Sequence, residues 1–249
     1  AYRAGMFVVI ALQGRIQDPR FLSQIGLVMG NKSGLNWDLS ANQSFYLLRE
    51  IYGLEKEACA KRVVELAEML SVSHVLDVPV RRLSLGERMK LELIASILHN
   101  PKVLFLDEPT IGLDIVSKKR VRQFLREIQN RLKITIILTS HDMTDVETVC
   151  DRVIVINKGQ KVYDGLLDQL WADYNQDRIV SFYLGNGLPT KLVWPQAELL
   201  SSSNDYLSYR VKKGMMSDLI SFVIKQTTVL DIEIMDTPLE DIIEKLFKQ

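Results

Sequence analysis

The sequence predicts an α/β protein built on a parallel sheet, with a helical insertion in the sheet and a small α+β appendage after it. Short apolar, β-branched runs alternate with longer segments of helical periodicity, as in parallel strands joined by helical crossovers. Residues 40–100 show helical patterns and no convincing strand, and after Tyr174 several shorter strand patterns follow. We therefore predict a first domain at residues 1–174, with a helical subdomain at about residues 40–100, and an accessory domain at residues 175–249.

The composition is that of an ordinary globular protein with balanced charge. The 249 residues include 31 Lys and Arg against 31 Asp and Glu, so the formal net charge is 0. This balance disfavours a generally basic nucleic-acid binder, and we expect no nucleic-acid partner. Two cysteines far apart in the sequence, Cys59 and Cys150, predict buried, reduced thiols and a cytosolic compartment. No run reaches the ~18 apolar residues that a membrane span needs.

Nearly continuous apolar runs predict the strands of the sheet, because both faces of a parallel sheet are covered. The predicted central strands are Val103–Leu106, Ile134–Leu138 and Val153–Ile156, and a further strand is expected at Met6–Leu12. Between the first two central strands, residues 115–132 have apolar positions at helical spacing. Asp114 is the expected N-cap of this crossover helix.

Capping patterns predict three helices in the insertion. Ser40 and Gln43 have the spacing of a capping box, and Gly53 is placed to end the helix that they begin. Residues 55–72 form a second amphipathic pattern, and a third helix is expected to begin at Ser84.

The appendage is predicted to contain several strands and two helices. The expected strands are Ile179–Leu184, Lys191–Trp194, Tyr206–Val211 and Val229–Ile234, and the expected helices are Met215–Lys225 and Pro238–Phe247. The last helix has Thr237 as its expected N-cap and a proline at its first position. The appendage contains no conspicuous ligand cluster, so the sequence assigns it no function.

Two carboxylates follow a predicted central strand. Asp107 and Glu108 come directly after the apolar run that begins at Val103. Ligands of open α/β sheets bind at the carboxyl ends of the strands, where Asp107 could hold a metal through water and Glu108 could take a proton from an attacking water. The alternative is that this acidic pair only caps a helix.

Two further segments carry candidate site residues. Ser84 and Glu87 have capping-box spacing, and Gly86 lets the backbone of this helix start approach a phosphate; an ordinary capped helix is the alternative. His141 follows the strand at residues 134–138 and could donate to a phosphate oxygen. Asp114 is either a helix cap or an interface carboxylate, or both.

Taken in order, these segments resemble the nucleotide-binding subunit of ABC transporters. LSLGE resembles the LSGGQ signature of that family, VLFLDE its Walker B strand with the catalytic glutamate, GLD its D-loop, and HD its switch histidine. The resemblance covers about residues 5–171 and implies a P-loop-NTPase-like fold. The sequence of these motifs most resembles that of subunits from exporters of drugs, polysaccharides and other lipid-related cargo. In those exporters the permease is a separate chain.

The resemblance also implies roles for the candidate residues. It implies ATP and Mg²⁺ as ligands, with Asp107 on the metal, Glu108 as general base and His141 on the γ-phosphate. Asn31 stands where the family has its Q-loop glutamine, so the resemblance implies that it binds the metal together with Asp107 and also contacts the nucleotide. Ser84 and Gly86 are implied to contact nucleotide held by a second, identical subunit, and Glu87 and Asp114 are also expected to bind nucleotide. A membrane-spanning permease is the other implied partner, which would place the chain on the cytoplasmic face of the membrane.

One family motif does not occur in the 249 residues. No GxxxxGK[ST] phosphate loop is present, and the similar GNKS at residues 30–33 lacks the upstream glycine. In the family this loop precedes the segment at which the chain opens, so we expect the sequence to be an N-terminally shortened ATPase core. The chain as given is expected to bind ATP weakly and to hydrolyse it negligibly.

Two other classes of function remain as alternatives. A non-catalytic scaffold could keep the signature helix and the permease-docking surface, although it would need neither Asp107, Glu108 nor His141. A soluble ABC ATPase of DNA repair or translation usually carries two cassettes or a long coiled coil, and neither is present in the sequence. Transported cargo is not indicated by any residue.

Overall fold

The computed structural model describes residues 18–30, 33–185 and 192–247. These residues divide into two compact units, one on each side of the bond between Cys150 and Asp151. The domain boundary expected after Tyr174 stays a prediction. Two other predictions, the strand at Met6–Leu12 and the role of Asn31, lie outside the described residues.

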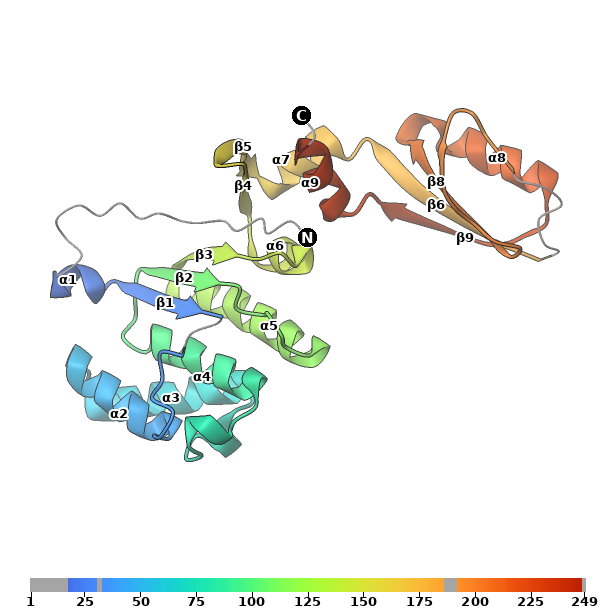
Figure 1. Ribbon diagram of the computed structural model, residues 1–249. Helices are drawn as coiled ribbons and strands as arrows, with labels where there is room; N and C mark the ends of the chain where they lie inside the picture. Colours follow the sequence, from blue (N-terminus) through green and yellow to red (C-terminus); the bar gives the residue numbers. More distant parts are fainter. Residues whose placement is uncertain (1–17, 31–32, 186–191, 248–249) are drawn as a thin grey trace. The chain divides into compact units, whose positions relative to one another are not determined.

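The first unit contains a parallel sheet of three strands in the order β1-β2-β3 (Figure 1). The strands are β1 (Ile25–Met29), β2 (Val103–Asp107) and β3 (Thr135–Thr139). In the register of the sheet, Met29 pairs with Asp107 and Asp107 pairs with Thr139, so the residues after all three strands lie along one edge. The predicted α/β fold with a parallel sheet is confirmed.

Strand β1 was absent from the predicted strands, although its five residues are apolar or glycine. Gly26 explains how β1 fits into the unit, because a Cβ there would lie 2.4 Å from the carbonyl oxygen of Ser96. The helix that carries Ser96 therefore packs directly on the backbone of β1. This close approach depends on a glycine and has no signature in hydrophobic periodicity.

The helices of the insertion begin and end where their caps predict. Helix α2 (Ala41–Tyr52) begins with the capping box of Ser40 and Gln43 and ends at Gly53, which has a φ of 62°. Helix α3 (Lys56–Leu70) follows, and α4 (Leu85–Ile97) begins with the capping box of Ser84 and Glu87. The remaining short helices between residues 18 and 84 are α1 (Pro19–Leu22), η1 (Ser73–Val75) and η2 (Val80–Arg82).

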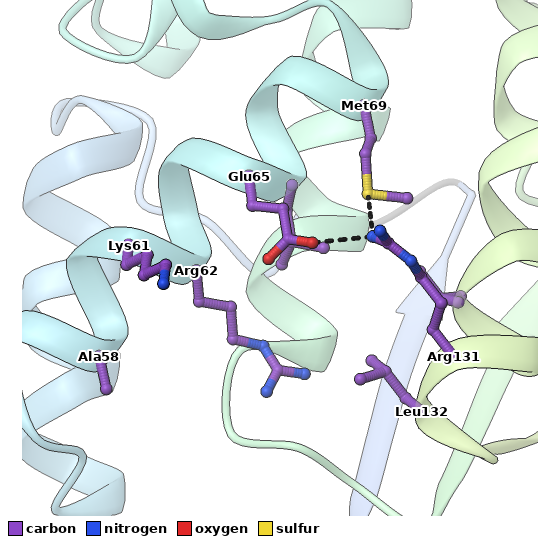
Figure 2. A pocket seen from close by; sticks show the side chains of 9 residues that line it. Ala58, Lys61, Arg62, Glu65, Met69, Arg131 and Leu132 are labelled. Carbon is purple, nitrogen blue, oxygen red and sulfur yellow. Dashed lines mark hydrogen bonds and ion pairs between the residues drawn. The ribbon is translucent and has the colours of Figure 1, made fainter.

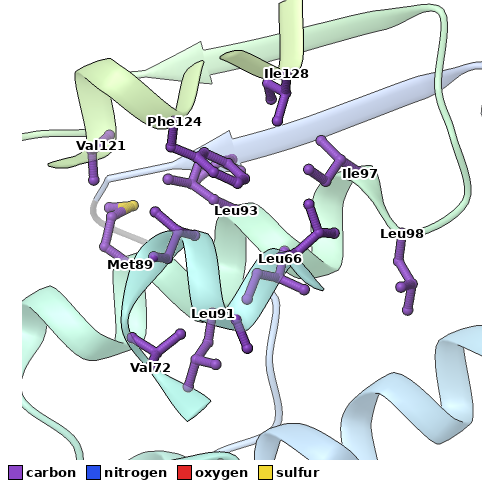
Figure 3. Packing of buried hydrophobic residues seen from close by; sticks show 14 of the residues in the cluster. Leu66, Val72, Met89, Leu91, Leu93, Ile97, Leu98, Val121, Phe124 and Ile128 are labelled. Carbon is purple, nitrogen blue, oxygen red and sulfur yellow. The ribbon is translucent and has the colours of Figure 1, made fainter. Parts of the chain in front are cut away.

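A single apolar cluster holds the sheet and the helices of the first unit together (Figure 3). Helix α5 (Ile115–Leu132) is the crossover between β2 and β3, and it is followed after β3 by α6 (Met143–Val149). Leu66 of α3, Leu93 of α4 and Phe124 of α5 are at most 4% exposed. Burial of such side chains contributes about 1.5–3 kcal/mol each, so α4 is fixed firmly against its neighbours.

In the second unit, the predicted central strand at Val153–Ile156 has a different partner. It forms β4 (Arg152–Asn157), which pairs antiparallel with β5 (Gln160–Leu166) instead of joining the parallel sheet. Lys158 and Gly159 between them both have positive φ, the geometry of a two-residue hairpin turn. The expectation that this strand is buried on both faces was also wrong, because Ile154 is 45% exposed.

The second unit also contains an antiparallel sheet of four strands in the order β7-β8-β6-β9. Helix α8 packs on one face, where Val180, Phe182, Leu207 and Tyr209 share a cluster with Leu219. The elements of this part are α7 (Leu167–Tyr174), β6 (Asp177–Leu184), β7 (Glu198–Ser202), β8 (Tyr206–Lys212), η3 (Lys213–Met215), α8 (Met216–Gln226), β9 (Val229–Asp236) and α9 (Leu239–Phe247).

The strand predicted at Lys191–Trp194 was wrong for its described residues. Residues 192–194 belong to no strand, and the strand of this region is β7, further along the chain. Two side chains of the run pack on the core, whereas Val193 is 64% exposed: Leu192 is 9% exposed, and Trp194 stacks on Phe222 with ring centroids 6.3 Å apart. The carbonyl oxygen of Leu192 also accepts a hydrogen bond from the Tyr209 hydroxyl. Leu192 and Trp194 are therefore apolar because they cover the core and not because they pair with a strand.

Two smaller expectations have mixed outcomes. Neither cysteine forms a disulfide, but only Cys59 is buried, because Cys150 is partly exposed. The Thr237 hydroxyl donates to the carbonyl oxygen of Asp177, and α9 begins two residues later. No helix in the described part of the chain has the length and apolar character that a bilayer crossing requires.

Candidate functional site

Asp107 lies at the carboxyl end of β2, with its side chain exposed. Its Oδ1 atom accepts a hydrogen bond of 2.6 Å from the Thr139 hydroxyl at the end of β3. Its backbone carbonyl accepts from the amide of Gly30, at the end of β1, at 2.8 Å. The ends of all three strands are thereby joined at Asp107, which holds its carboxylate at the edge of the sheet.

Glu108 and His141 are in contact although they are far apart in the sequence. The Oε2 atom of Glu108 lies 2.7 Å from Nδ1 of His141. The Glu108 side chain is 27% exposed, whereas that of His141 is 65% exposed. The amide of Glu108 donates to the carbonyl oxygen of Thr139 at 3.0 Å, which ties the turn after β2 to the end of β3.

The backbone at Glu108 is unusual. Its φ is 51°, in the left-handed region that costs a residue with a Cβ about 1–2 kcal/mol. A Cβ on Gly30 would lie 2.7 Å from the Glu108 carbonyl oxygen, so the chain after β1 passes directly against this turn. Asn31 is the next residue along the chain, outside the described residues. Strain of this kind is found at functional sites, where the surrounding structure maintains it.

The predicted residues at the start of α4 form a second group. Ser84 is exposed, and its amide and hydroxyl donate to Oε2 of Glu87 at 2.9 and 2.7 Å. These hydrogen bonds, that of the hydroxyl first, lower the pKa of the Glu87 carboxyl. His74 lies 3.4 Å from the same carboxylate, and its side chain is exposed.

The starts of α4 and α5 lie against each other. A Cβ added to Gly86 would lie 3.3 Å from the Ser117 hydroxyl oxygen, so this glycine permits the close approach of the two helices. Asp114 is the N-cap of α5, as predicted, and accepts a hydrogen bond from the Ser117 amide at 2.9 Å. That hydrogen bond lowers the pKa of the exposed Asp114 carboxyl.

The predicted site residues therefore form two groups in the structure. One consists of Asp107, Glu108 and His141 at the edge of the sheet, and the other consists of Ser84, Gly86, Glu87 and Asp114 at the starts of α4 and α5. Among the described residues, hydrogen bonds join Glu108 to His141 and Ser84 to Glu87, and none joins the two groups to each other.

Glu92 is a residue that the sequence analysis missed. It lies on the apolar side of α4 and is 8% exposed. Its carboxylate accepts hydrogen bonds from the Ser33 hydroxyl, from the Gly34 amide at 2.9 and 3.0 Å, and from the Leu35 amide at 3.2 Å. The signal that could have found it is a carboxylate among buried Leu and Ile positions of a helix. Its role is to fasten the segment that follows β1 to α4.

A groove of about 400 Å³ lies between α3 and α5, away from both groups (Figure 2). Arg131 on α5 reaches Glu65 and the sulfur of Met69 on α3, and Arg62 donates to the Ile97 carbonyl oxygen. The last turn of α5 lines the groove, and this turn directly precedes the amino end of β3. It is therefore at the end of the sheet opposite the carboxylates, and none of the predicted site residues lines it.

The fold and the two groups define a class of protein, the P-loop-NTPase-like α/β proteins. The structure of cbiO1 from Clostridium perfringens, described as part of the ABC transporter complex cbiONQ, matches with a TM-score of 0.55 and 30% sequence identity. The match covers 61% of this chain and 61% of that one. A family model described as "AAA domain, putative AbiEii toxin, Type IV TA system" matches residues 23–144.

Relatives identify the family within that class. The ABC transporter ATP-binding protein NatA of Bacillus subtilis is 31% identical over 166 residues, which are 66% of this chain and 67% of NatA. The chain belongs to the family of ABC transporter ATP-binding proteins.

Other relatives differ in what their names say about transport. The Nod factor export ATP-binding protein I of Ralstonia nicotianae is 33% identical over 70% of this chain and 54% of its own. The glucose import ATP-binding protein GlcV of Saccharolobus solfataricus is 32% identical over 66% of this chain and 46% of its own. The chain thus spans about half the length of these two relatives.

Proposed function

We propose that this chain is part of the ATP-hydrolysing subunit of an ABC transporter, and that Asp107, Glu108 and His141 do its chemistry. The observation that carries the proposal is the contact of 2.7 Å between Glu108 and His141 beside Asp107, at the carboxyl edge of a parallel sheet. Ligands bind at this edge in open α/β sheets. Membership of the ATP-binding family supplies the substrate class.

In this proposal Glu108 is the general base. Its carboxylate accepts the proton of the attacking water, and its hydrogen bond with His141 keeps it oriented. With Nδ1 of His141 facing Glu108, the other ring nitrogen is left for a phosphate oxygen, to which it donates when the ring carries both protons.

Asp107 would hold Mg²⁺, directly or through water. One of its oxygens is fixed by Thr139 and the side chain is exposed, which fits an ion that needs only one or two carboxylates besides phosphate and water. When bound, the ion would neutralise charge on the phosphate oxygens. Asn31, outside the described residues, is proposed to share the ion in place of the family glutamine.

The second group is proposed to contact nucleotide held by another, identical subunit. The start of α4 offers amides and a positive dipole end, with Ser84, Gly86 and Glu87 in its first turn. Apolar side chains surround it and Asp114: Leu85, Ile111, Ile115 and Val116 are 39%, 43%, 85% and 72% exposed. Contiguous exposed apolar residues mark interaction surfaces, which supports a second subunit here.

A membrane-spanning permease is proposed to dock on the segment that follows β1 and on α2. Trp37, Tyr46, Leu47 and Ile51 are 53%, 55%, 49% and 74% exposed. This would place the chain at the cytoplasmic face of a membrane. The proposed direction of transport is export, because the sequence from LSLGE to GLD resembles that of exporter subunits. The names of the relatives include both export and import.

The enzymatic proposal is tested on the complete gene product with its permease. Glu108→Gln keeps the size of the side chain but removes the base, so ATP hydrolysis is expected to fall about 10²–10⁴-fold while nucleotide binding persists. Lys133→Gly, far from the site, is the control and should leave hydrolysis unchanged. Full hydrolysis by the Glu108→Gln variant would overturn the role of Glu108 as base. Absence of hydrolysis by the wild-type gene product, or an in-frame stop codon directly upstream of Ala1, would favour the scaffold alternative.

A further inference from the structure

Asp145 is a buried carboxylate that the proposed chemistry does not use. It lies in α6 and is 1% exposed, whereas carboxylates are almost never fully buried unless they are paired. Its Oδ1 atom accepts a hydrogen bond of 2.6 Å from Nε of Arg122 on α5. Another nitrogen of Arg122 lies 2.9 Å from Asp142, so the charge of the guanidinium is shared by two carboxylates.

The second oxygen of Asp145 joins the two loops that carry the catalytic side chains. Oδ2 accepts a short hydrogen bond from the hydroxyl of Thr110, two residues after Glu108. It also accepts from the Ser140 hydroxyl at 2.7 Å, and Ser140 directly precedes His141. One buried oxygen atom is therefore bound by both the turn after β2 and the turn after β3.

We propose that Asp145 is a positioning residue that keeps Glu108 and His141 within hydrogen-bond distance. The benefit of this positioning for catalysis rests on the proposed function. The contact between Glu108 and His141 that it maintains is a property of the folded chain alone. His141 has an exposed side chain, so burial does not fix its position; its turn is held by Ser140. Charge-assisted hydrogen bonds are roughly twice as strong as neutral ones, which suits Asp145 to this task.

A purely structural role for Asp145 would have a different consequence. If Asp145 served only to pair with Arg122, it would hold α5 to α6, and the hydroxyls of Thr110 and Ser140 would matter little. If it positions the site, removing a hydroxyl should disturb the contact between Glu108 and His141 while the pair with Arg122 persists. The two roles are therefore separable by variants of Thr110.

The test uses the 249-residue chain labelled with ¹⁵N-histidine. Three histidines occur in the sequence, and His141→Gln assigns the signal of His141. In Asp145→Asn we expect the ring nitrogen signals of His141 to move to the positions that they take in Glu108→Gln. The signals of His74 and His99, which bind Glu87 and the Ile25 carbonyl oxygen, should stay in place and serve as internal controls.

Thr110 provides a matched pair of variants should Asp145→Asn fail to fold. Thr110→Ser keeps the hydroxyl and should leave the His141 signals unchanged, whereas Thr110→Val should move them. Amide exchange at Glu108 is expected to become about 10-fold faster or more in Thr110→Val, as for loss of a hydrogen bond to a charged group, and to stay within about twofold in Thr110→Ser.

Two outcomes would overturn the inference, and they differ in what else they overturn. If Glu108→Gln moves the His141 signals but neither folded Asp145→Asn nor Thr110→Val does, Asp145 has no positioning role and the proposed function stands. If Glu108→Gln leaves the signals in place as well, the contact itself is absent, and the proposed catalytic group fails together with the inference.

Discussion

At the scale of single residues, a left-handed backbone conformation occurs both at the candidate site and at the ends of helices, for different reasons. Among the described residues other than glycine, Ser71, Asn100, Glu108, Lys133 and Lys158 have positive φ. Ser71 and Lys133 are C-caps, where a left-handed residue ends a helix. Glu108 ends no helix, and its carboxylate contacts His141. Its conformation is therefore maintained by the packing of the site rather than by helix termination.

Lys133 allows the cost of this conformation to be measured away from the site. Replacing it by glycine should raise the free energy of unfolding by about 0.5–1 kcal/mol, because glycine adopts the left-handed cap without a clash. Lys133→Ala keeps a Cβ and is the matched control, with stability expected close to wild type. Urea denaturation followed by circular dichroism measures both, and a glycine variant less stable than the alanine variant would contradict the prediction.

At the scale of secondary-structure elements, α4 carries the second group at its start and a buried carboxylate further along. Its capping box should make stability depend on pH. The folded-state pKa of Glu87 is lowered, so its contribution is present above the ordinary glutamate pKa of about 4.3 and is lost as pH falls through the lower folded value.

Ser84→Ala tests this dependence. It should cost about 1 kcal/mol of unfolding free energy at pH 7 and less at an acidic pH below the lowered folded-state pKa of Glu87. Glu87→Gln keeps the capping geometry without the titrating group, so its stability relative to wild type should improve as the pH falls. Equal costs of Ser84→Ala at both pH values, measured by chemical denaturation, would refute the assignment.

Glu92 fastens the segment after β1 to the same helix, and its removal is expected to be costly. Glu92→Ala leaves the amides of Gly34 and Leu35 without their acceptor, so we expect a loss of about 3 kcal/mol. Glu92→Gln keeps an acceptor oxygen of similar size and should cost about 1 kcal/mol. Denaturation curves of the two variants compare these values, and the prediction fails if the alanine variant is no less stable than the glutamine variant.

At the scale of the whole molecule, the proposed function requires phosphate-binding groups in addition to the two groups of site residues. A phosphate loop supplies the amides and the lysine that hold the β- and γ-phosphates, and none occurs in the 249 residues. We therefore expect the chain alone to bind MgATP with a Kd above about 1 mM. A calorimetric titration measures this affinity, and micromolar binding would show that other residues hold the phosphates.

Local features were predictable because they depend on residues close together in the sequence. The capping boxes of Ser40 and Ser84, and the N-cap at Asp114, each involve residues three positions apart, and all three have their predicted geometry. The partner of each strand was harder to predict from the sequence. The apolar run at Val153–Ile156 fits a parallel strand equally well, but the two-residue turn after it directs it to β5.

The order of the motifs, the helix caps and the family were contained in the amino-acid sequence, because short-range hydrogen bonding and residue spacing record them directly. The contact between Glu108 and His141 and the burial of Asp145 and Glu92 were decided by the folded chain. Side chains meet across the sheet only when parallel strands lie in register and their loops share one edge. A carboxylate is buried only where several donors, distant in sequence, converge on it.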